Sequence, residues 1–239
     1  MIPYIIINGV SSRTIHGLLI QSLPPISKPK IKTSIEEIDG RDGDIVTTLG
    51  YAAYDKPMTI GLKGDYDIDE IIKYFNSSGR INFSNEIDKY YNFAIYEAID
   101  FNKLLRYRTA NVNIHVQPFK YSMHEPHIVW NNPGSATIAT IKVKNNGNVA
   151  SRPLLTIQGK GTITVYINNK QILSIALSNS GETIIVDSAD MNATSPSGSY
   201  LNRKVTGDYD KLTFPVGINE LRVTGTISKI TLETYSRWI

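Results

Sequence analysis

The first residues that could do chemistry are histidines and acids spaced like metal ligands. Residues 124–127 read His-Glu-Pro-His, and imidazole and carboxylate groups are common zinc ligands. The order differs from the His-Glu-x-x-His helix of zinc proteases, and Pro126 excludes a regular helix here. His16 and His115 lie far away along the chain, and one of them would have to fold close to complete a site. We therefore interpret this segment as a polar linker and expect no metal ion.

Acidic residues around two glycines form a second candidate site. Residues 39–44 read Asp-Gly-Arg-Asp-Gly-Asp, and calcium loops also combine acids with glycine. Arg41 and Gly43, however, occupy the third and fifth ligand positions, and Gly50 replaces the closing glutamate. Tight turns explain the Asp-Gly pairs better, so we expect a hairpin tip. Its central residues are candidate interface residues: Arg41, Asp42, Gly43 and Asp44.

Nucleophilic and phosphate-binding motifs are absent from the sequence. The chain has no Gly-x-Ser-x-Gly element, and Ser195 and Ser197 have no histidine near them in the sequence. Residues 159–161 read Gly-Lys-Gly but lack the spacing of a phosphate-binding loop. Distance along the sequence does not exclude a catalytic triad assembled from residues far apart in the chain. We predict a protein that is not an enzyme and that carries no cofactor.

Aromatic residues offer a binding function instead. Trp130 and Tyr166 are candidate sugar-stacking residues, because an exposed ring on a β-sandwich can pack against the face of a sugar. Alternation places Tyr166 on the face opposite Ile163, Val165 and Ile167. A second buried face or a subunit contact explains this position equally well. A carbohydrate-binding module is therefore the alternative function.

Composition and charge exclude several other classes of protein. The chain has 239 residues, a net charge of +3 and no cysteine. A disulfide framework and thiolate metal sites are thus excluded, and the charge is too small to indicate a nucleic-acid binder. No apolar run approaches the roughly 20 residues that span a bilayer, so we expect no membrane insertion. The first eight residues lack the basic region and long apolar core of a signal peptide.

The elements that must position these residues are mostly strands. Alternation of apolar and polar residues predicts half-buried antiparallel strands. The clearest cases are residues 5–7, 58–62, 112–116, 163–167, 212–216 and 230–232. Asn8 and Gly9 form a hairpin-turn pair directly after the first strand, and both are candidate interface residues.

One segment has the period of a helix instead. The apolar residues of residues 67–75 recur three and four positions apart, which predicts a helix of about three turns packed on a sheet. Asp67 is suited to cap its N-terminus, and Gly79 is the predicted stop.

Prolines mark the boundary between two domains. Pro118, Pro126 and Pro133 lie close together, with a helix-containing β segment before them and strands alone after them. We predict a mainly β protein: residues 1–128 form a β domain with one short helix and a hairpin, and residues 129–239 form a jelly-roll β-sandwich. Residues 188–208, rich in Ser, Asn, Gly and Thr, are predicted to be a long surface loop.

A string of short motifs covers nearly the whole chain. The motifs lie at residues 41–48, 56–60, 67–75, 79–83, 90–96, 112–121, 143–148, 152–153, 181–187 and 217–221. Each motif alone is common, but their order and spacing over two domains resemble the distal tail (Dit) proteins of long-tailed bacteriophages.

The resemblance implies a structural role. In this family the N-terminal β domain forms a hexameric ring at the tail tip, and a galectin-like sandwich lies outside it. The ring joins the tail tube protein to the tail-associated hub protein, and in many members it anchors receptor-binding proteins. DNA passes through the lumen without sequence-specific binding. The resemblance thus implies a virion protein of the tail tip, made in the cytoplasm of a bacterial host.

The same resemblance bears on the alternative function. Some members carry insertions in the outer domain that bind cell-wall sugars, and 239 residues leave little room for one. A ring needs a head-to-tail contact whose rotation closes, and edge strands of antiparallel sheets are suited to pair across subunits. The Asn8–Gly9 hairpin and the tip at residues 39–44 are both candidate donors, which the sequence alone does not rank.

Overall fold

The computed structural model describes residues 2–239. The chain folds into two compact units, one up to Met123 together with Ile239, and one from His124 to Trp238. Strands make up 56% of the chain and helices 10%, which confirms the predicted mainly β class. The assignment of residues 1–128 to a ring-forming domain and of residues 129–239 to a second domain stays a prediction.

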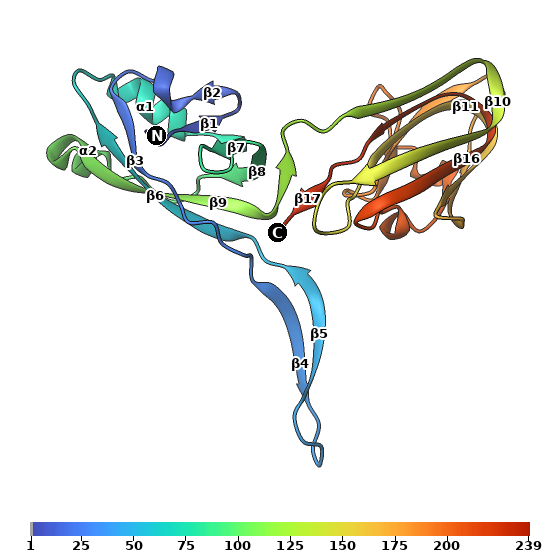
Figure 1. Ribbon diagram of the computed structural model, residues 1–239, viewed down its shortest axis with the longest axis horizontal. Coiled ribbons are helices and arrows are strands. Elements are labelled where there is room, and N and C mark those ends of the chain that lie inside the picture. Colours follow the sequence, from blue (N-terminus) through green and yellow to red (C-terminus); the bar gives the residue numbers. More distant parts are fainter. Residues whose placement is uncertain (1) are drawn as a thin grey trace. The chain divides into compact units, whose positions relative to one another are not determined.

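The N-terminal unit is built on one antiparallel sheet (Figure 1). Its strands follow the order β2-β1-β7-β8-β9-β6-β3. Their bounds are β1 (Ile5–Ile7), β2 (Val10–Ser11), β3 (Leu18–Ser22), β6 (Tyr54–Leu62), β7 (Ser78–Phe83), β8 (Lys89–Ala94) and β9 (Thr109–Ser122). A 3₁₀ turn, η1 (Ser12–Thr14), follows β2. Alternate residues of the long strands β6 and β9 form the core with helix α1.

Helix α1 (Ile68–Phe75) confirms the predicted helix. The Asp67 carboxylate caps it by accepting hydrogen bonds from the backbone N–H groups of Asp69 and Glu70, at 3.0 and 3.1 Å. The predicted stop is wrong, because Gly79 lies inside β7. A side chain at this position would lie 2.3 Å from Oδ1 of Asn8, so the glycine makes room for the hairpin turn.

A second helix, α2 (Phe101–Tyr107), is not predicted by the periodicity. It has fewer than two full turns of sequence, and of its residues only Leu104 is buried. Asp100 caps it by accepting a hydrogen bond from the Lys103 N–H at 2.8 Å. So short a helix depends on its cap and on one buried side chain, and neither produces a periodic signal.

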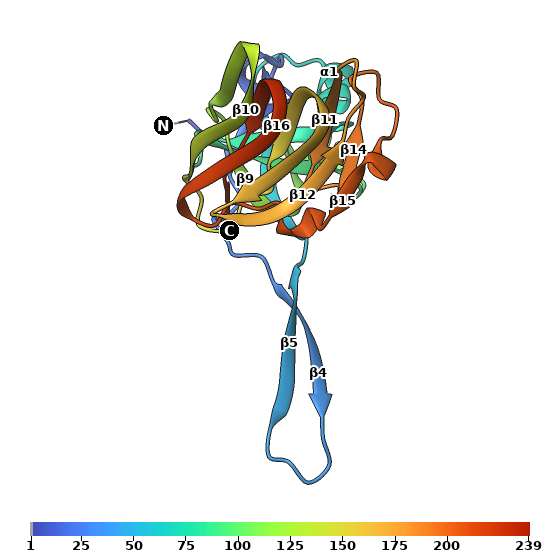
Figure 2. The same cartoon turned by 90° about the vertical axis from the view of Figure 1, so that its right-hand side faces the viewer.

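Strands β4 (Ile31–Glu37) and β5 (Asp44–Tyr51) form a separate two-stranded sheet. Figure 2 shows this hairpin extending away from the main sheet of the same unit, and we call it the arm. The predicted hairpin tip at residues 39–44 joins the two strands of the arm. None of residues 31–51 belongs to the hydrophobic core of the unit.

The C-terminal unit is a curled antiparallel sheet with a large apolar core. Its strands run in the order β10-β16-β11-β12-β15, with β13 on β11 and β14 on β13. Their bounds are β10 (His127–Asn145), β11 (Leu154–Ile167), β12 (Lys170–Ala176), β13 (Glu182–Asp187), β14 (Asn192–Thr194), β15 (Val205–Gly207) and β16 (Gly217–Glu233). The short strand β17 (Arg237–Trp238) follows β16 in the chain and is not part of this sheet.

Strand β11 changes partner along its length and so curls the sheet. Its first half pairs with β13 and its second half with β12, with a register shift between Lys160 and Thr164. Gly159 lies near this change, and a side chain there would lie 2.5 Å from the carbonyl oxygen of Thr226. The arrangement is consistent with the predicted β-sandwich.

Two sequence expectations for this unit are wrong. Residues 212–216 contribute a single bridge, from Phe214 to Ser151, instead of a strand. Residues 188–208 are not a plain loop, since they contain β14, β15 and the turn η2 (Asn202–Lys204), followed by η3 (Tyr209–Lys211). The Asn202 side chain accepts a hydrogen bond from the backbone N–H of Ala193. Local hydrogen bonding by polar residues therefore orders a segment whose composition is typical of loops.

Candidate functional site

The residues with catalytic or metal-binding chemistry do not assemble. No group of three or more His, Asp or Glu side chains within residues 2–239 is placed to hold a metal ion. Nδ1 of His115 lies 2.8 Å from the Asp55 carboxylate, within hydrogen-bonding distance, at the surface of the N-terminal unit. The hydroxyls of Ser195 and Ser197 lie 2.8 Å apart, so they hydrogen-bond to each other. In the part of the chain that the structure describes, no helix is long and apolar enough to cross a bilayer.

The arm is the first surface with the properties of an interface. Ile35 of β4 and Val46 of β5 are direct cross-strand partners. Each of the two side chains is 59% exposed, although they form an apolar pair. Ile38 and Leu49 add two more exposed apolar side chains on the same hairpin. A solitary two-stranded hairpin is marginally stable in water, so an arm of this composition gains from a partner surface.

Charge is segregated along the arm. Residues 36–44 contain five acids and one arginine, a net charge of −4, whereas the whole chain carries +3. The candidate residues Arg41, Asp42, Gly43 and Asp44 all lie at this acidic end and are exposed. The segment that leads into the arm is basic instead, with Lys28, Lys30 and Lys32. This pattern provides a stripe with three kinds of contact: basic root, apolar middle and acidic tip.

The root of the arm is fixed to the sheet by hydrogen bonds to backbone carbonyls. The Lys56 ammonium donates to the Pro25 oxygen at 2.8 Å, and the Tyr54 hydroxyl donates to the Ser27 oxygen at 3.3 Å. Lys56 is 1% exposed, and its ammonium lies 5.1 Å from the centre of the Tyr91 ring. Burial lowers the pKa of Lys56, and the nearby carboxylate of Glu86 opposes this shift.

Glu86 is the anion at the centre of this buried cluster. It pairs with Lys120 at 2.5 Å and accepts a hydrogen bond from the Tyr91 hydroxyl at 3.0 Å. Burial is the first cause that raises the pKa of Tyr91, and the charge of Glu86 adds to it. The cluster holds two lysines against one glutamate, and it stabilises the base from which the arm extends.

The Asn8–Gly9 hairpin is the second candidate surface. Both residues have positive φ, 48° and 86°, as the turn type preferred by Asn-Gly pairs requires. The Asn8 side chain also locks the turn onto β7. Its Nδ2 donates to the carbonyl oxygen of Ser78 at 2.9 Å, and its Oδ1 accepts from the Arg80 N–H at 2.9 Å. The hairpin is therefore a rigid surface feature.

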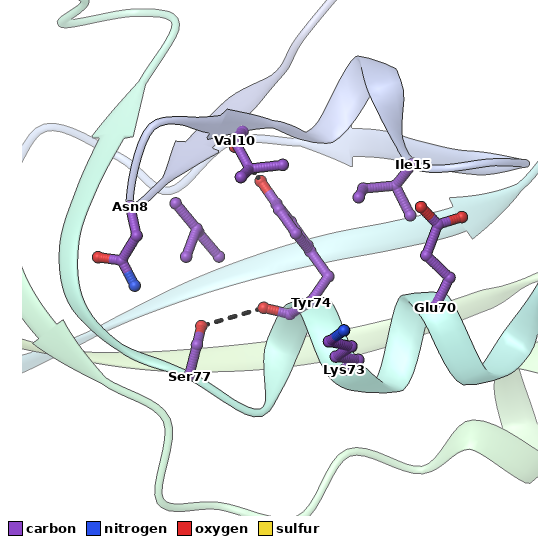
Figure 3. Close-up of a pocket in the computed structure, with 8 residues that line it drawn as sticks. Asn8, Val10, Ile15, Glu70, Lys73, Tyr74 and Ser77 are labelled. Atoms are coloured by element: carbon purple, nitrogen blue, oxygen red, sulfur yellow. Dashed lines mark hydrogen bonds between the residues drawn. The ribbon is translucent and has the colours of Figure 1, made fainter.

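An apolar pocket of about 290 Å³ lies beside this hairpin (Figure 3). Its walls are Ile7, Ile15 and Tyr74, all three almost fully buried. The rim is formed by Asn8, Val10, Glu70, Lys73 and Ser77. The Tyr74 hydroxyl donates to the Val10 carbonyl at 3.1 Å and so joins helix α1 to β2. The rim carries one charge of each sign, and Glu70 accepts a hydrogen bond from the His16 N–H at 3.2 Å.

The sequence did not indicate this pocket. Tyr74 lies within the predicted helix, whereas Ile7 belongs to β1 and Ile15 directly follows η1. The assembly of the pocket depends on how β2 and α1 meet, which no local pattern specifies.

The structure separates the two candidate sugar-stacking residues. Trp130 pairs with Ile230 and packs against the core of the C-terminal unit. Tyr166 pairs with Arg222, whose guanidinium lies 4.5 Å from the centre of the Tyr166 ring. Ile230 is buried and Arg222 is half-buried on the opposite face of β16. The two rings therefore do not share a site, and Arg222 already covers one face of Tyr166.

Comparison with known proteins gives a match in structure alone. A scan of protein-family models finds no match, and no curated protein matches the sequence. Among solved structures, the fold is similar to that of the Dit protein of phage SPP1, which is described as a paradigm of the hub adsorption apparatus in phages that infect Gram-positive bacteria. The similarity has a TM-score of 0.64 at 15% identity, and it covers 98% of this chain and 99% of the phage protein.

Proposed function

We propose that this chain is a structural protein of a bacteriophage tail. Six copies form a ring at the tail tip of the virion, and the ring joins the tail tube protein to the hub protein. Receptor-binding proteins attach to it, and DNA passes through its lumen without sequence-specific contacts. The observation that carries the proposal is the similarity to SPP1 Dit, because it extends over both units and nearly the full length of each chain.

The exposed arm supports the ring. A ring requires a heterologous contact, in which one patch of each copy binds a different patch of the next copy. The arm offers exposed apolar side chains and an acidic tip, and among the described residues its two strands pair only with each other. A stable contact of this kind buries about 1,600 Å² in total. Extended hairpins provide such area with few residues, because both faces are accessible.

The size of the particle in solution tests the proposal. The chain has a mass of 26.6 kDa, so a ring of six has about 160 kDa, six times that value. Light scattering on purified protein, followed by electron microscopy, measures both mass and symmetry. We expect closed six-membered rings, formed alone or after addition of a hub protein. A chain that stays monomeric under both conditions contradicts the proposal.

The carbohydrate-binding alternative has less support. It requires an open aromatic platform that contacts the host cell wall, whereas Trp130 packs on the core and Tyr166 lies against Arg222. Retention of residues 124–238 on cell-wall glycans, abolished by Tyr166→Ala, would favour it. If residues 124–238 are not retained on the glycans, the carbohydrate-binding alternative is excluded and the structural role in the tail is the remaining proposal for this unit.

A further inference from the structure

We propose that the apolar pocket beside the Asn8–Gly9 hairpin receives Ile38 from the arm of a second copy. This inference rests on the proposed ring and specifies its contact. The pocket lies beside the candidate residues Asn8 and Gly9, and Ile38 directly precedes the tip residues 39–44. The two candidate surfaces are thus the two halves of one heterologous interface.

The donor is suited to an apolar pocket with charges at its rim. Ile38 is 47% exposed and opens the turn at the tip, where its carbonyl accepts a hydrogen bond from the Arg41 N–H at 3.1 Å. Its neighbours Glu37 and Asp39 are both acidic. The tip therefore presents one apolar side chain between two carboxylates, with a guanidinium three residues further along.

The acceptor complements these features. The pocket walls are apolar, and about 290 Å³ holds more than one aliphatic side chain, since a cavity of about 150 Å³ already binds benzene. Lys73 at the rim belongs to the last turn of α1 and has no salt bridge among the described residues. It can pair with Glu37 or Asp39 of the incoming tip, while Glu70 can pair with Arg41.

The topology places donor and acceptor at opposite ends of the unit. The arm joins the sheet at Ser22 of β3 and Tyr54 of β6, whereas the other ends of these strands, Leu18 and Leu62, lead to Ile15 and to α1. The nine residues of β6 span about 30 Å at a rise of about 3.3 Å per residue. An arm therefore cannot reach the pocket of its own chain, and Figures 1 and 2 both show α1 far from the arm. Contacts between such separated patches connect copies head to tail.

Cysteine cross-linking tests the contact directly, because the natural chain has no cysteine. The double variant Ile38→Cys/Val10→Cys places one thiol at the tip and one at the rim of the pocket. Under mild oxidation we expect a ladder of covalent oligomers up to the hexamer in a denaturing gel. The matched control Thr47→Cys/Val10→Cys has its arm thiol in the middle of β5 and is expected to give no ladder, as is each single variant.

A charge exchange provides an independent measurement. Lys73→Glu is expected to raise the dissociation constant of the ring about tenfold, and Lys73→Glu/Asp39→Lys is expected to recover it. Lys229→Glu, on the C-terminal unit, is the matched control with little effect.

The outcomes separate the two proposals. Rings that form normally but give no Ile38–Val10 cross-link, with no response to Lys73→Glu, overturn the pocket contact and leave the ring standing. A chain that never assembles, alone or with a hub protein, overturns both. Cross-linked ladders together with charge recovery support the contact.

Discussion

The Lys56 ammonium donates a hydrogen bond to the Pro25 carbonyl oxygen across 2.8 Å, from a site that is almost closed to solvent. Lys56 lies on β6, which follows the arm, and Pro25 lies in the segment that precedes it. One side chain therefore ties together the two ends of the arm. A mobile root would allow the arm to point in many directions. This bond therefore fixes the direction of the arm and also stabilises the N-terminal unit.

The neighbouring ion pair gives the first prediction. Lys120→Met leaves the buried carboxylate of Glu86 without its ion-pair partner at 2.5 Å, which costs about 3 kcal/mol of unfolding free energy. Lys56→Met removes a buried charge together with its hydrogen bond, so the lost bond and the relieved desolvation partly cancel. We expect a cost of at most about 1.5 kcal/mol. Chemical denaturation of both variants measures the difference.

The double variant Glu86→Gln/Lys120→Met is the control for this mechanism. It removes the unpaired anion, so it should be more stable than Lys120→Met alone. If Lys120→Met proves no more costly than Lys56→Met, the ion pair does not stabilise the arm root as described.

Part of this fold could be predicted from sequence. Alternation identified β6 and β9 because each strand buries one face. Helix α1 was predicted because the capping residue Asp67 and the apolar stripe indicate the same start and the same period. The same alternation places Lys56 on the inward face with Met58 and Ile60, so the burial of Lys56 could be predicted from the sequence. The position of Glu86 beside it could not be predicted, because Glu86 lies in the turn between β7 and β8 and follows no periodic pattern.

The candidate site was predictable at its edges and not at its centre. Asn8 and Gly9 were recognised from turn chemistry, and residues 39–44 from their Asp-Gly pairs. The pocket depends on the contact of Tyr74 with the carbonyl of Val10, 64 residues apart in sequence. Contacts at such separation are set by the packing of whole elements, which turn and period rules do not describe.

Crowding at Gly207 gives the second prediction. This residue has a φ of 123°, and a side chain here would lie 2.3 Å from the Ile172 carbonyl oxygen of the paired strand β12. Gly198 has a φ of 85° with nothing within 4 Å. Gly198→Ala therefore meets backbone strain alone, about 1 kcal/mol, whereas Gly207→Ala must also displace a strand and costs about 3 kcal/mol. Equal melting temperatures of the two variants would contradict this reasoning.

The pair between Glu182 and Lys204 gives the third prediction, which concerns pH. The hydrogen bond from Lys204, at 2.7 Å to Oε1, is the first cause that holds the pKa of Glu182 below its ordinary value of 4.5. The unfolded chain therefore binds a proton more readily than the folded chain does, so this contribution is present above pH 4.5 and is lost as the pH falls through the folded pKa.

Melting temperatures from pH 7 to pH 3 check this sign. At pH 7 the natural protein should exceed Lys204→Met in unfolding free energy by less than about 1 kcal/mol, since the pair is partly exposed. This difference should shrink below pH 4.5. The control variant Lys229→Met leaves Glu182 and its partner unchanged. Its melting temperature should therefore fall towards low pH by as much as that of the natural protein. An advantage that grows towards low pH would rule out the ion pair as its cause.

Removal of the arm gives the last prediction. Residues 32–50 can be replaced by Asn-Gly, because the backbone N–H of Ala52 already bonds to the Lys30 carbonyl at 2.8 Å and holds the two ends together. None of the removed residues contributes to the core, so the unfolding free energy should change by less than about 1 kcal/mol. Light scattering should nevertheless show only monomers, since the shortened chain lacks its half of the heterologous contact. Rings from the shortened chain would show that other surfaces suffice, and a loss of cooperative unfolding would show that the arm belongs to the folding core.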